Sequence, residues 1–202
     1  MFTNDNTECS TKISIISQNK FDQWFIKQSI FNKNWCLSNN FKGEKGKILK
    51  IPYDDGRLKE VVIGEGKIAD LSGISSFSST NIGNYFSFLK YSDSSETDVQ
   101  KAWIWGQHQL RHKTSQNSLY VKDKDKIKFL NHYSKATKLS LDLINMPANE
   151  LNPLTFSKIV KNHKLFSKFY FKKYTNSQIK KLFPLTYAVG KSSNIHPEFL
   201  QV

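Results

Sequence analysis

Two pairs of side chains in this sequence have the type and spacing to do chemistry. His108 and His112 lie four residues apart, so on a helix both rings face one side, as in zinc-binding pairs. The residues between them include no general base, and no third ligand is evident, so packing competes with metal binding. Asp54 and Asp55 are adjacent carboxylates, but adjacent acids just before a glycine are typical of a solvated turn.

A glycine motif offers a third possibility, a phosphate site. Gly64, Gly66 and Ala69 fit the spacing G-x-G-x-x-A, which lets a pyrophosphate approach a helix N-terminus. The strand before Gly64 is expected to belong to a hairpin, whereas the nucleotide motif requires a parallel βαβ unit. We therefore favour a turn with two glycines. Cys9 and Cys36 form neither a CxxC site nor a disulfide framework, which indicates free thiols.

The chain is strongly basic, with a net charge of +13 and an isoelectric point of about 9.6. Its only arginines are Arg57 and Arg111. Base readout and bidentate phosphate binding favour arginine. We therefore interpret the many lysines as a general bias in the composition of the chain and do not expect nucleic acid as a partner. Residues 151–202 hold nine lysines and one acid, Glu198. This imbalance indicates a basic face, or a segment that meets an acidic surface outside this chain.

Hydrophobic residues make up 38% of the 202 residues, which is enough for a packed core and too apolar for a disordered chain. No run approaches the roughly 18 apolar residues of a membrane span, so a membrane is not expected as a partner. Residues 1–10 are polar and lack the apolar segment of a secretion signal. We therefore expect a cytoplasmic protein.

The first half of the chain predicts strands and helices in alternation. β-Branched residues predict a strand at 13–16, and aromatic residues at helical spacing predict one helix over 21–31. Two apolar runs, 47–52 and 58–63, are joined by an Asp-Asp-Gly turn and predict a hairpin. Residues 72–84 are rich in Ser, Gly and Asn and predict a loop.

Longer helices are predicted in the second half. A strand at 85–91 precedes a helix that starts at the N-cap candidates Ser94, Ser95 and Thr97 and runs through Leu110. A short strand follows at 119–121. An apolar stripe at steps of three or four predicts a helix from Asp125 that stops before Pro147. Its members are Ile127, Leu130, Tyr133, Ala136, Leu139 and Leu143.

Asn152 and Pro153 predict the start of the next helix, because Asn is a good N-cap and Pro costs nothing at the first helical position. Beyond it the sequence predicts, in order, a strand at 169–174, a helix at 178–182, an apolar segment at 183–189 and the beginning of a strand at 198–202. The long helix links two unlike segments, so we place a domain boundary in its first half.

The link between the two helices is the most specific stretch of the chain. Residues 141–153 read Leu-Asp-Leu-Ile-Asn-Met-Pro-Ala-Asn-Glu-Leu-Asn-Pro. This stretch resembles the Arg-Asp-Leu-(Ile/Val)-Asn-Thr-Pro-(Ala/Pro)-Asn entry to the catalytic domain of the leucine aminopeptidase (cytosol aminopeptidase) family. Leu141 replaces the usual Arg, and Met146 replaces the usual Thr.

A second stretch carries the same resemblance. Residues 183–193 contain Ala-Val-Gly-Lys-Ser-Ser, which is similar to the family's Ala-Val-Gly-x-(Gly/Ala)-Ser, with Ser192 in place of the small residue. Residues 35–46 and 102–106 resemble the N-terminal domain of the bacterial branch more loosely. The resemblance covers about residues 35–202. It favours packing for the two histidines and a turn for the two glycines.

The resemblance implies an α/β fold in two parts. We expect a macro-like N-terminal α/β domain with a mixed sheet over 1–126. Residues 127–202 would form the truncated start of the α/β metallopeptidase catalytic domain. Such a fragment should bury its apolar face poorly.

The resemblance also implies a function for the parent protein. Members of the family are leucyl aminopeptidases, metallo-exopeptidases that use two divalent ions (zinc, manganese or magnesium) to activate a bridging water against N-terminal peptide bonds. They act on peptide substrates and assemble as hexamers. The family's metal ligands lie in Lys-Gly-…-Asp-Thr-Gly-Gly and Asn-Thr-Asp-Ala-Glu-Gly-Arg segments, and neither is in this sequence.

No catalytic, cofactor-binding or metal-binding residue is therefore assigned in this chain. Lys191 follows a glycine but lacks the Asp-Thr-Gly-Gly continuation of the family's segment. We expect the chain alone to be inactive and to hold no metal. The alternatives are a non-catalytic macro-like module that binds nucleotide or nucleic acid, and an oligomerisation piece.

Overall fold

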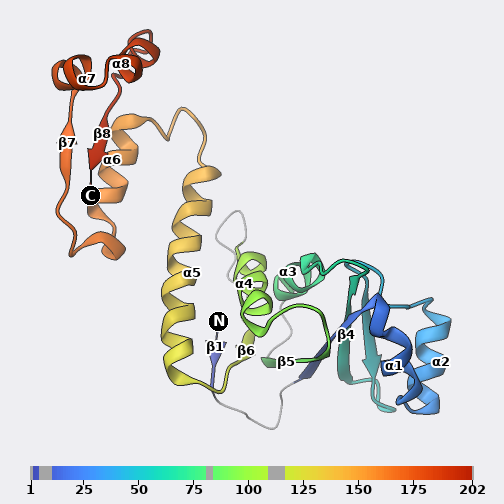
Figure 1. Ribbon diagram of the computed structural model, residues 1–202. Coiled ribbons are helices and arrows are strands. Elements are labelled where there is room, and N and C mark those ends of the chain that lie inside the picture. Colours follow the sequence, from blue (N-terminus) through green and yellow to red (C-terminus); the bar gives the residue numbers. More distant parts are fainter. Residues whose placement is uncertain (1, 5–10, 81–83, 109–116, 202) are drawn as a thin grey trace. The chain divides into compact units, whose positions relative to one another are not determined.

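The computed structural model describes residues 2–4, 11–80, 84–108 and 117–201 (Figure 1). The chain divides into two compact units, Met1–Thr137 and Lys138–Val202, which we describe separately as unit 1 and unit 2. In the part of the chain that is described, no helix combines the length and the apolar character that a membrane span requires.

Unit 1 is built on a mixed six-stranded sheet. Its strand order is β1-β6-β5-β2-β4-β3, and every neighbouring pair is parallel except the antiparallel pair β3 and β4. The strands are β1 (Phe2–Thr3), β2 (Thr11–Ser17), β3 (Ile48–Pro52), β4 (Leu58–Gly66), β5 (Asn84–Tyr91) and β6 (Ser118–Tyr120). The expected mixed α/β sheet is confirmed, as is the hairpin, whose turn is closed by the Tyr53 N–H donating to the Arg57 carbonyl at 2.7 Å.

The central strand β2 shows why these residues form a sheet. It pairs with β4 along one edge and with β5 along the other, so it lies inside the sheet, and a separate core covers each of its faces. Ile13, Ile15 and Ile16 are completely buried, as expected for a parallel strand that lacks a solvent-facing side. Ile13 and Ile15 belong to one core, and Ile16 belongs to the core on the opposite face.

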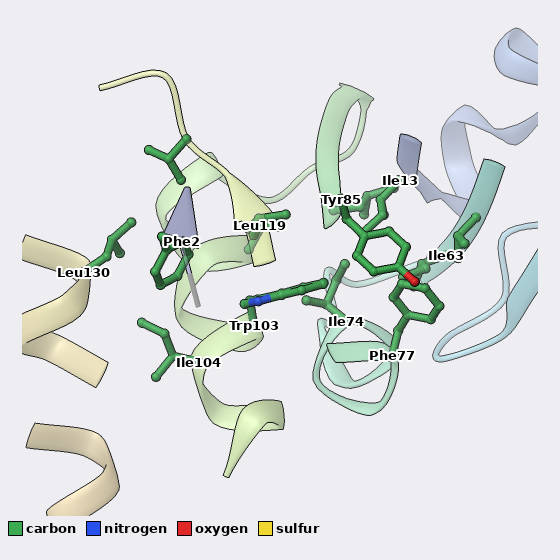
Figure 2. Packing of buried hydrophobic residues seen from close by; sticks show 14 residues of the cluster. Phe2, Ile13, Ile63, Ile74, Phe77, Tyr85, Trp103, Ile104, Leu119 and Leu130 are labelled. Carbon is green, nitrogen blue, oxygen red and sulfur yellow. The ribbon is translucent and has the colours of Figure 1, made fainter. Parts of the chain in front are cut away.

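The larger core lies between the sheet and the helices α3 (Ser72–Ser78), α4 (Glu96–Gln107) and α5 (Lys124–Ile144). Figure 2 shows Trp103 of α4 among the side chains of this core. Phe77 meets Tyr85 edge to face with ring centres 5.1 Å apart, and Tyr85 lies 5.9 Å from Trp103. Such tilted aromatic pairs add stability beyond their buried area. The start of α5 joins the core through Leu130.

The second face of the sheet is covered by α1 (Phe21–Ile26), after the 3₁₀ turn η1 (Gln18–Lys20), and by α2 (Ile30–Ser38). The single helix expected over 21–31 is wrong: the chain forms two. The first helix ends at Ile26, and Ser29 caps the second, since its side chain accepts the N–H of Asn32. Burial of Cys36 on α2 raises the pKa of its thiol to about 11, so the thiolate is disfavoured.

The loop expected over 72–84 is also wrong in its first half, because residues 72–78 form helix α3. Ile74 and Phe77 lie three residues apart and are buried in the larger core. Asp70 accepts the backbone N–H of Ser72 at 2.9 Å, which satisfies a donor of the first turn. Tertiary burial of one narrow apolar stripe thus outweighs the weak helix propensity of Ser and Gly.

Unit 2 contains the end of α5, then α6 (Pro153–Asn162), η2 (Lys164–Phe166), β7 (Lys172–Tyr174), α7 (Asn176–Leu182), α8 (Pro184–Gly190) and β8 (Phe199–Gln201). The expected cap is confirmed: the Asn152 side chain accepts the Thr155 N–H at 3.0 Å, and Thr155 accepts the Asn152 N–H at 2.8 Å. β7 and β8 form an antiparallel pair.

Few apolar side chains are buried in unit 2. Among its described residues, Val160 and Ile179 are the buried hydrophobics. Leu182, Leu185 and Val189 expose 54%, 83% and 82% of their surface, and together we call them the α7–α8 apolar face. A unit with so little buried apolar surface gains little stability from its own core.

The compact units divide inside α5, between residues 137 and 138, because the first half of that helix packs on the core of unit 1. We expected a domain boundary at 126/127, in the first turn of the same helix. Compact units need not coincide with family domains, so the boundary stays a prediction.

Candidate functional site

In open α/β sheets, ligands bind at the carboxyl ends of parallel strands. In unit 1 these ends belong to β2, β4 and β5, and they bring together Ser17, Glu65 and Ser92 with Asp93 next to them. Lys20 reaches the same place from η1. We call these five residues the strand-end cluster; it contains two carboxylates, one ammonium and two hydroxyls.

Four residues of the strand-end cluster, Lys20, Glu65, Ser92 and Asp93, bond to one another. The carboxylate of Glu65 is fully buried and accepts the Ser92 hydroxyl at 2.5 Å and the Asp93 N–H at 2.8 Å. The Lys20 ammonium lies 2.5 Å from the Asp93 carboxylate and donates to the Ser92 carbonyl at 3.0 Å. These contacts hold the ends of β4 and β5 together.

Electrostatics supports a structural role for this cluster. The hydrogen bond from Lys20, assisted by the Ser17 hydroxyl, lowers the pKa of Asp93 below its usual value. Asp93 is therefore anionic at neutral pH and poorly suited to act as a general acid. We therefore assign the cluster a structural role, in which it joins the strand ends, and no catalytic role.

Gly64 and Gly66 allow a loop of the protein itself to pack closely against the end of β4. A Cβ on Gly64 would lie 2.1 Å from the carbonyl oxygen of Glu44, and a Cβ on Gly66, where φ is +80°, would lie 3.0 Å from Lys45. The Gly46 N–H donates to the Gly64 carbonyl at 3.0 Å, and the Gly66 N–H donates to the Gly43 carbonyl at 2.9 Å. The loop over 43–46 thus covers these glycines, and the next helix starts only at residue 72, so the requirements of a pyrophosphate site are not met.

The adjacent acids lie in the hairpin turn. Asp55 accepts both the backbone N–H of Arg57 at 3.0 Å and its Nε at 2.7 Å, and the backbone bond is the main reason that the pKa of Asp55 is lowered. Asp54 is exposed on the same turn. These acids form and close the turn and do not form an acid–base pair.

The structure describes only one member of the predicted histidine pair, His108. The helix expected to run through Leu110 ends at Gln107, so His108 caps α4 and lies outside its last turn. His112 lies outside the described residues. Within the described part of the chain, no three His, Cys, Asp or Glu side chains gather in a way that could hold a metal ion. Lys191 is exposed at the end of α8.

A pocket of about 480 Å³ lies beside β3, the edge strand of the sheet. The residues that line the pocket include two lysines, Lys47 and Lys50. The Lys47 ammonium is directed to the Asn40 carbonyl and lies 3.6 Å from the Glu44 carboxylate. The Trp35 indole donates to the Lys50 carbonyl at 2.9 Å. This bond uses one backbone carbonyl of the edge strand that could otherwise pair with another strand. Nothing in this pocket assembles reactive groups.

Comparison with known proteins now identifies the class. Residues 11–121 match the family described as M17 aminopeptidase, N-terminal domain, so the chain belongs to the M17 aminopeptidase family. The matched residues include five strands of the sheet in unit 1, from β2 to β6, and the helices on both of its faces. No curated protein matches the chain.

Solved structures show the same fold. A cytosol aminopeptidase from Coxiella burnetii matches with a TM-score of 0.76 and 19% identity, over 98% of this chain and 45% of that one. The bottromycin maturation enzyme BotP, in complex with Mn, gives 0.66 and 16%, over 96% and 44%. A tomato leucine aminopeptidase mutant gives 0.65 and 15%, over 99% and 49%. The chain therefore spans less than half the length of these relatives.

Sequence reasoning missed the strand-end cluster. Its members are spread from residue 17 to residue 93, and only the pairing of β2, β4 and β5 brings them together. A polar residue at the end of each predicted parallel strand was the available signal, but the alternation of strands with helices did not define their order in the sheet.

Proposed function

We propose that this chain is the N-terminal part of a leucyl aminopeptidase, a metallo-exopeptidase that removes N-terminal residues from peptides. The observation that carries the proposal is the family match over 11–121, within a chain that aligns with aminopeptidase structures over nearly all of its length. Unit 1 would be the family's N-terminal domain, and unit 2 the opening of its catalytic domain.

The chemistry of the parent protein would come from polypeptide outside this chain. Two divalent ions would lower the pKa of a bridging water and polarise the scissile carbonyl. The described residues do not fit such a centre, since no three candidate ligands gather, and the family's two ligand segments are absent from the sequence. The Mn complex of BotP is consistent with manganese as one of the ions, beside zinc and magnesium.

The α7–α8 apolar face supports this proposal. Leu185 and Val189 lie one helical turn apart and are more than four-fifths exposed, which is unusual for aliphatic side chains unless another surface packs on them. The catalytic remainder of the parent protein would supply that surface. The parent protein would assemble as a hexamer, as the family resemblance implies.

Activity measurements test the proposal. The 202-residue chain and a longer protein, which also contains the translation of the coding DNA after Val202, are compared on leucine p-nitroanilide with Mn²⁺ or Zn²⁺ added. We expect metal-dependent release of p-nitroaniline by the longer protein only. Turnover by the pure 202-residue chain would contradict the proposal, as would downstream DNA that encodes neither ligand segment.

A further inference from the structure

The turn that joins α6 to β7 (Figure 1) carries two adjacent aromatic residues that are exposed to solvent. Phe169 is 55% exposed and Tyr170 is 84% exposed. We call residues 163–172 the basic–aromatic turn. Rings of this size contribute large apolar area when they are covered, so two adjacent exposed rings indicate a contact surface.

Lysines flank these rings. Lys164, Lys168 and Lys172 are exposed in the same turn. No carboxylate occurs anywhere from residue 151 to residue 197. Among the ion pairs of the described residues, none involves these three lysines; Lys172 instead lies over the Tyr174 ring, 5.0 Å from its centre. The carboxylates of unit 2 are few, and two of them, Asp142 and Glu198, pair with Lys138 and Lys173. The lysines of the turn therefore form a positive patch that no ion pair among the described residues neutralises.

Of the two exposed rings, Phe169 is held in place by neighbouring residues of the turn. Phe166 meets Phe169 edge to face at 6.0 Å and Phe171 at 6.1 Å. The Phe169 N–H donates to the Phe166 carbonyl at 3.0 Å, and the Leu165 N–H donates to His163 Nδ1 at 3.2 Å. A ring that is already ordered loses less conformational entropy when a partner stacks on it.

The chemistry of the turn selects among partners. A second copy of this same turn would place lysines against lysines, so we do not take it as the occupant. The α7–α8 apolar face is aliphatic and suits protein packing, whereas this turn offers flat ring faces between point charges. Contact with single-stranded nucleic acid needs those two features and no arginine fork, because bases stack on rings and phosphates pair with lysines. The scarcity of arginine argues only against readout of base edges.

We propose that the basic–aromatic turn is a binding site for single-stranded nucleic acid, with Phe169 and Tyr170 as stacking platforms and the flanking lysines as phosphate contacts. This site does not depend on the proposed peptidase function. It predicts little preference among sequences, because every base has a stacking face.

Fluorescence anisotropy of labelled oligothymidylate and oligouridylate, titrated with the 202-residue chain, measures the interaction. We expect saturable binding to both strands, which weakens with salt between about 50 and 200 mM, with a logarithmic slope near −2 for three phosphate contacts. Absence of binding to both strands at the lower salt concentration would overturn the proposal. Binding to one strand alone would assign the site to DNA or to RNA.

Ring variants separate stacking from plain charge. Tyr170→Leu removes a ring that is mostly exposed, so the fold should be kept, and we expect affinity to fall about tenfold. Phe169→Leu should act in the same direction. Phe129→Leu is the matched control, since Phe129 on α5 is 58% exposed and lies outside unit 2. Unchanged affinity in Tyr170→Leu, with circular dichroism showing a folded chain, would refute the stacking role.

Charge variants locate the site. The double variant Lys164→Gln with Lys168→Gln should make the salt slope shallower by about 1.4. Lys124→Gln with Lys135→Gln removes the same charge from exposed positions on α5 and should leave the slope unchanged. Equal losses in both double variants would mean diffuse attraction and overturn the assignment.

Two further probes address other polyanions. Phosphatidylserine vesicles and poly-L-glutamate carry negative charge without bases. If either binds as tightly as the oligonucleotide and loses affinity in Tyr170→Leu to the same extent, the surface belongs to a lipid or an acidic polypeptide, and the proposal fails.

Discussion

At the residue scale, Asp70 shows how one side chain links two parts of unit 1. Its carboxylate lies 2.8 Å from the Lys45 ammonium, in the loop that covers the glycines of β4, and it accepts the first-turn N–H of Ser72 on α3. The hydrogen bond from Lys45 is the main cause that lowers the pKa of Asp70 from 3.8 to about 2, followed by the bonds from Ser72. The folded state therefore binds this proton less tightly than the unfolded state.

Asp70→Asn should reveal that linkage as a pH dependence. The folded-state pKa is depressed, so the carboxylate stabilises the fold above pH 3.8 and loses this contribution as the pH falls toward about 2. Lys45 is largely exposed, so solvent screening limits the effect at neutral pH to about 1 kcal/mol. Urea unfolding of the wild type and Asp70→Asn at several pH values measures it.

Asp54→Asn, at an exposed position in the hairpin turn, is the control for the Asp70 experiment and should show no such dependence. A difference between wild type and Asp70→Asn that stays constant from neutral pH to pH 2 would contradict the linkage.

Single residues also show what the sequence could predict. The Asn152–Pro153 helix start and the Asp-Asp-Gly hairpin turn were predictable because each depends on local backbone bonding. The role of Gly64 and Gly66 was only partly predictable. A glycine motif does not say whether a phosphate or the protein's own loop approaches the backbone. Here the loop over 43–46, which precedes the hairpin, covers the glycines at the end of the second hairpin strand.

At the element scale, the close crossing of α3 and α4 depends on Gly106. A Cβ on this residue would lie 1.8 Å from the Ser75 carbonyl oxygen and 2.1 Å from the Ser78 hydroxyl. The Ser75 hydroxyl in turn donates to the Ala102 carbonyl at 2.9 Å, which joins the two helices by a polar contact. The sheet-facing sides of both helices supply the larger core, so their separation affects that core directly.

Gly106→Ala should destabilise unit 1, although alanine has the higher helix propensity. Propensity alone would predict a gain of about 0.5–1 kcal/mol. The overlap with Ser75 instead forces the helices apart, at a cost of about 1–3 kcal/mol. Thermal unfolding followed by circular dichroism measures the sign. Gly56→Ala is the comparison, since its Cβ meets nothing within 4 Å and only its φ of +83° is strained. A Gly106→Ala protein as stable as the wild type would contradict this packing.

Elements were predictable where burial and local signals agree. Strands β2 to β5 and the long helix α5 follow from strong apolar patterns. Helix α3 was missed, because Ser-rich and Gly-rich sequence predicts a loop until the buried face of the sheet is known. The break between α1 and α2 was missed, because the aromatic residues keep helical spacing across it. Strand β1 is only two residues long, and it forms by pairing with β6, more than a hundred residues away.

At the scale of the whole molecule, the two units differ in how completely they bury apolar surface. Unit 1 encloses the cores on both faces of its sheet, whereas the described part of unit 2 buries few hydrophobic side chains and exposes the α7–α8 apolar face. Family and fold were predictable from residues 141–153 and 183–193. A catalytic site could not be predicted, because the two metal-ligand segments of the family are absent from the sequence.

Metal binding by the purified 202-residue chain tests the central claim, that the family's chemistry resides in polypeptide outside this chain. Isothermal titration calorimetry with MnCl₂ and with ZnCl₂ measures it directly. We expect no saturable, stoichiometric uptake of either ion, because no cluster of metal ligands is assembled among the described residues and the net charge of +13 repels cations. Uptake of two ions per chain with micromolar affinity would contradict it.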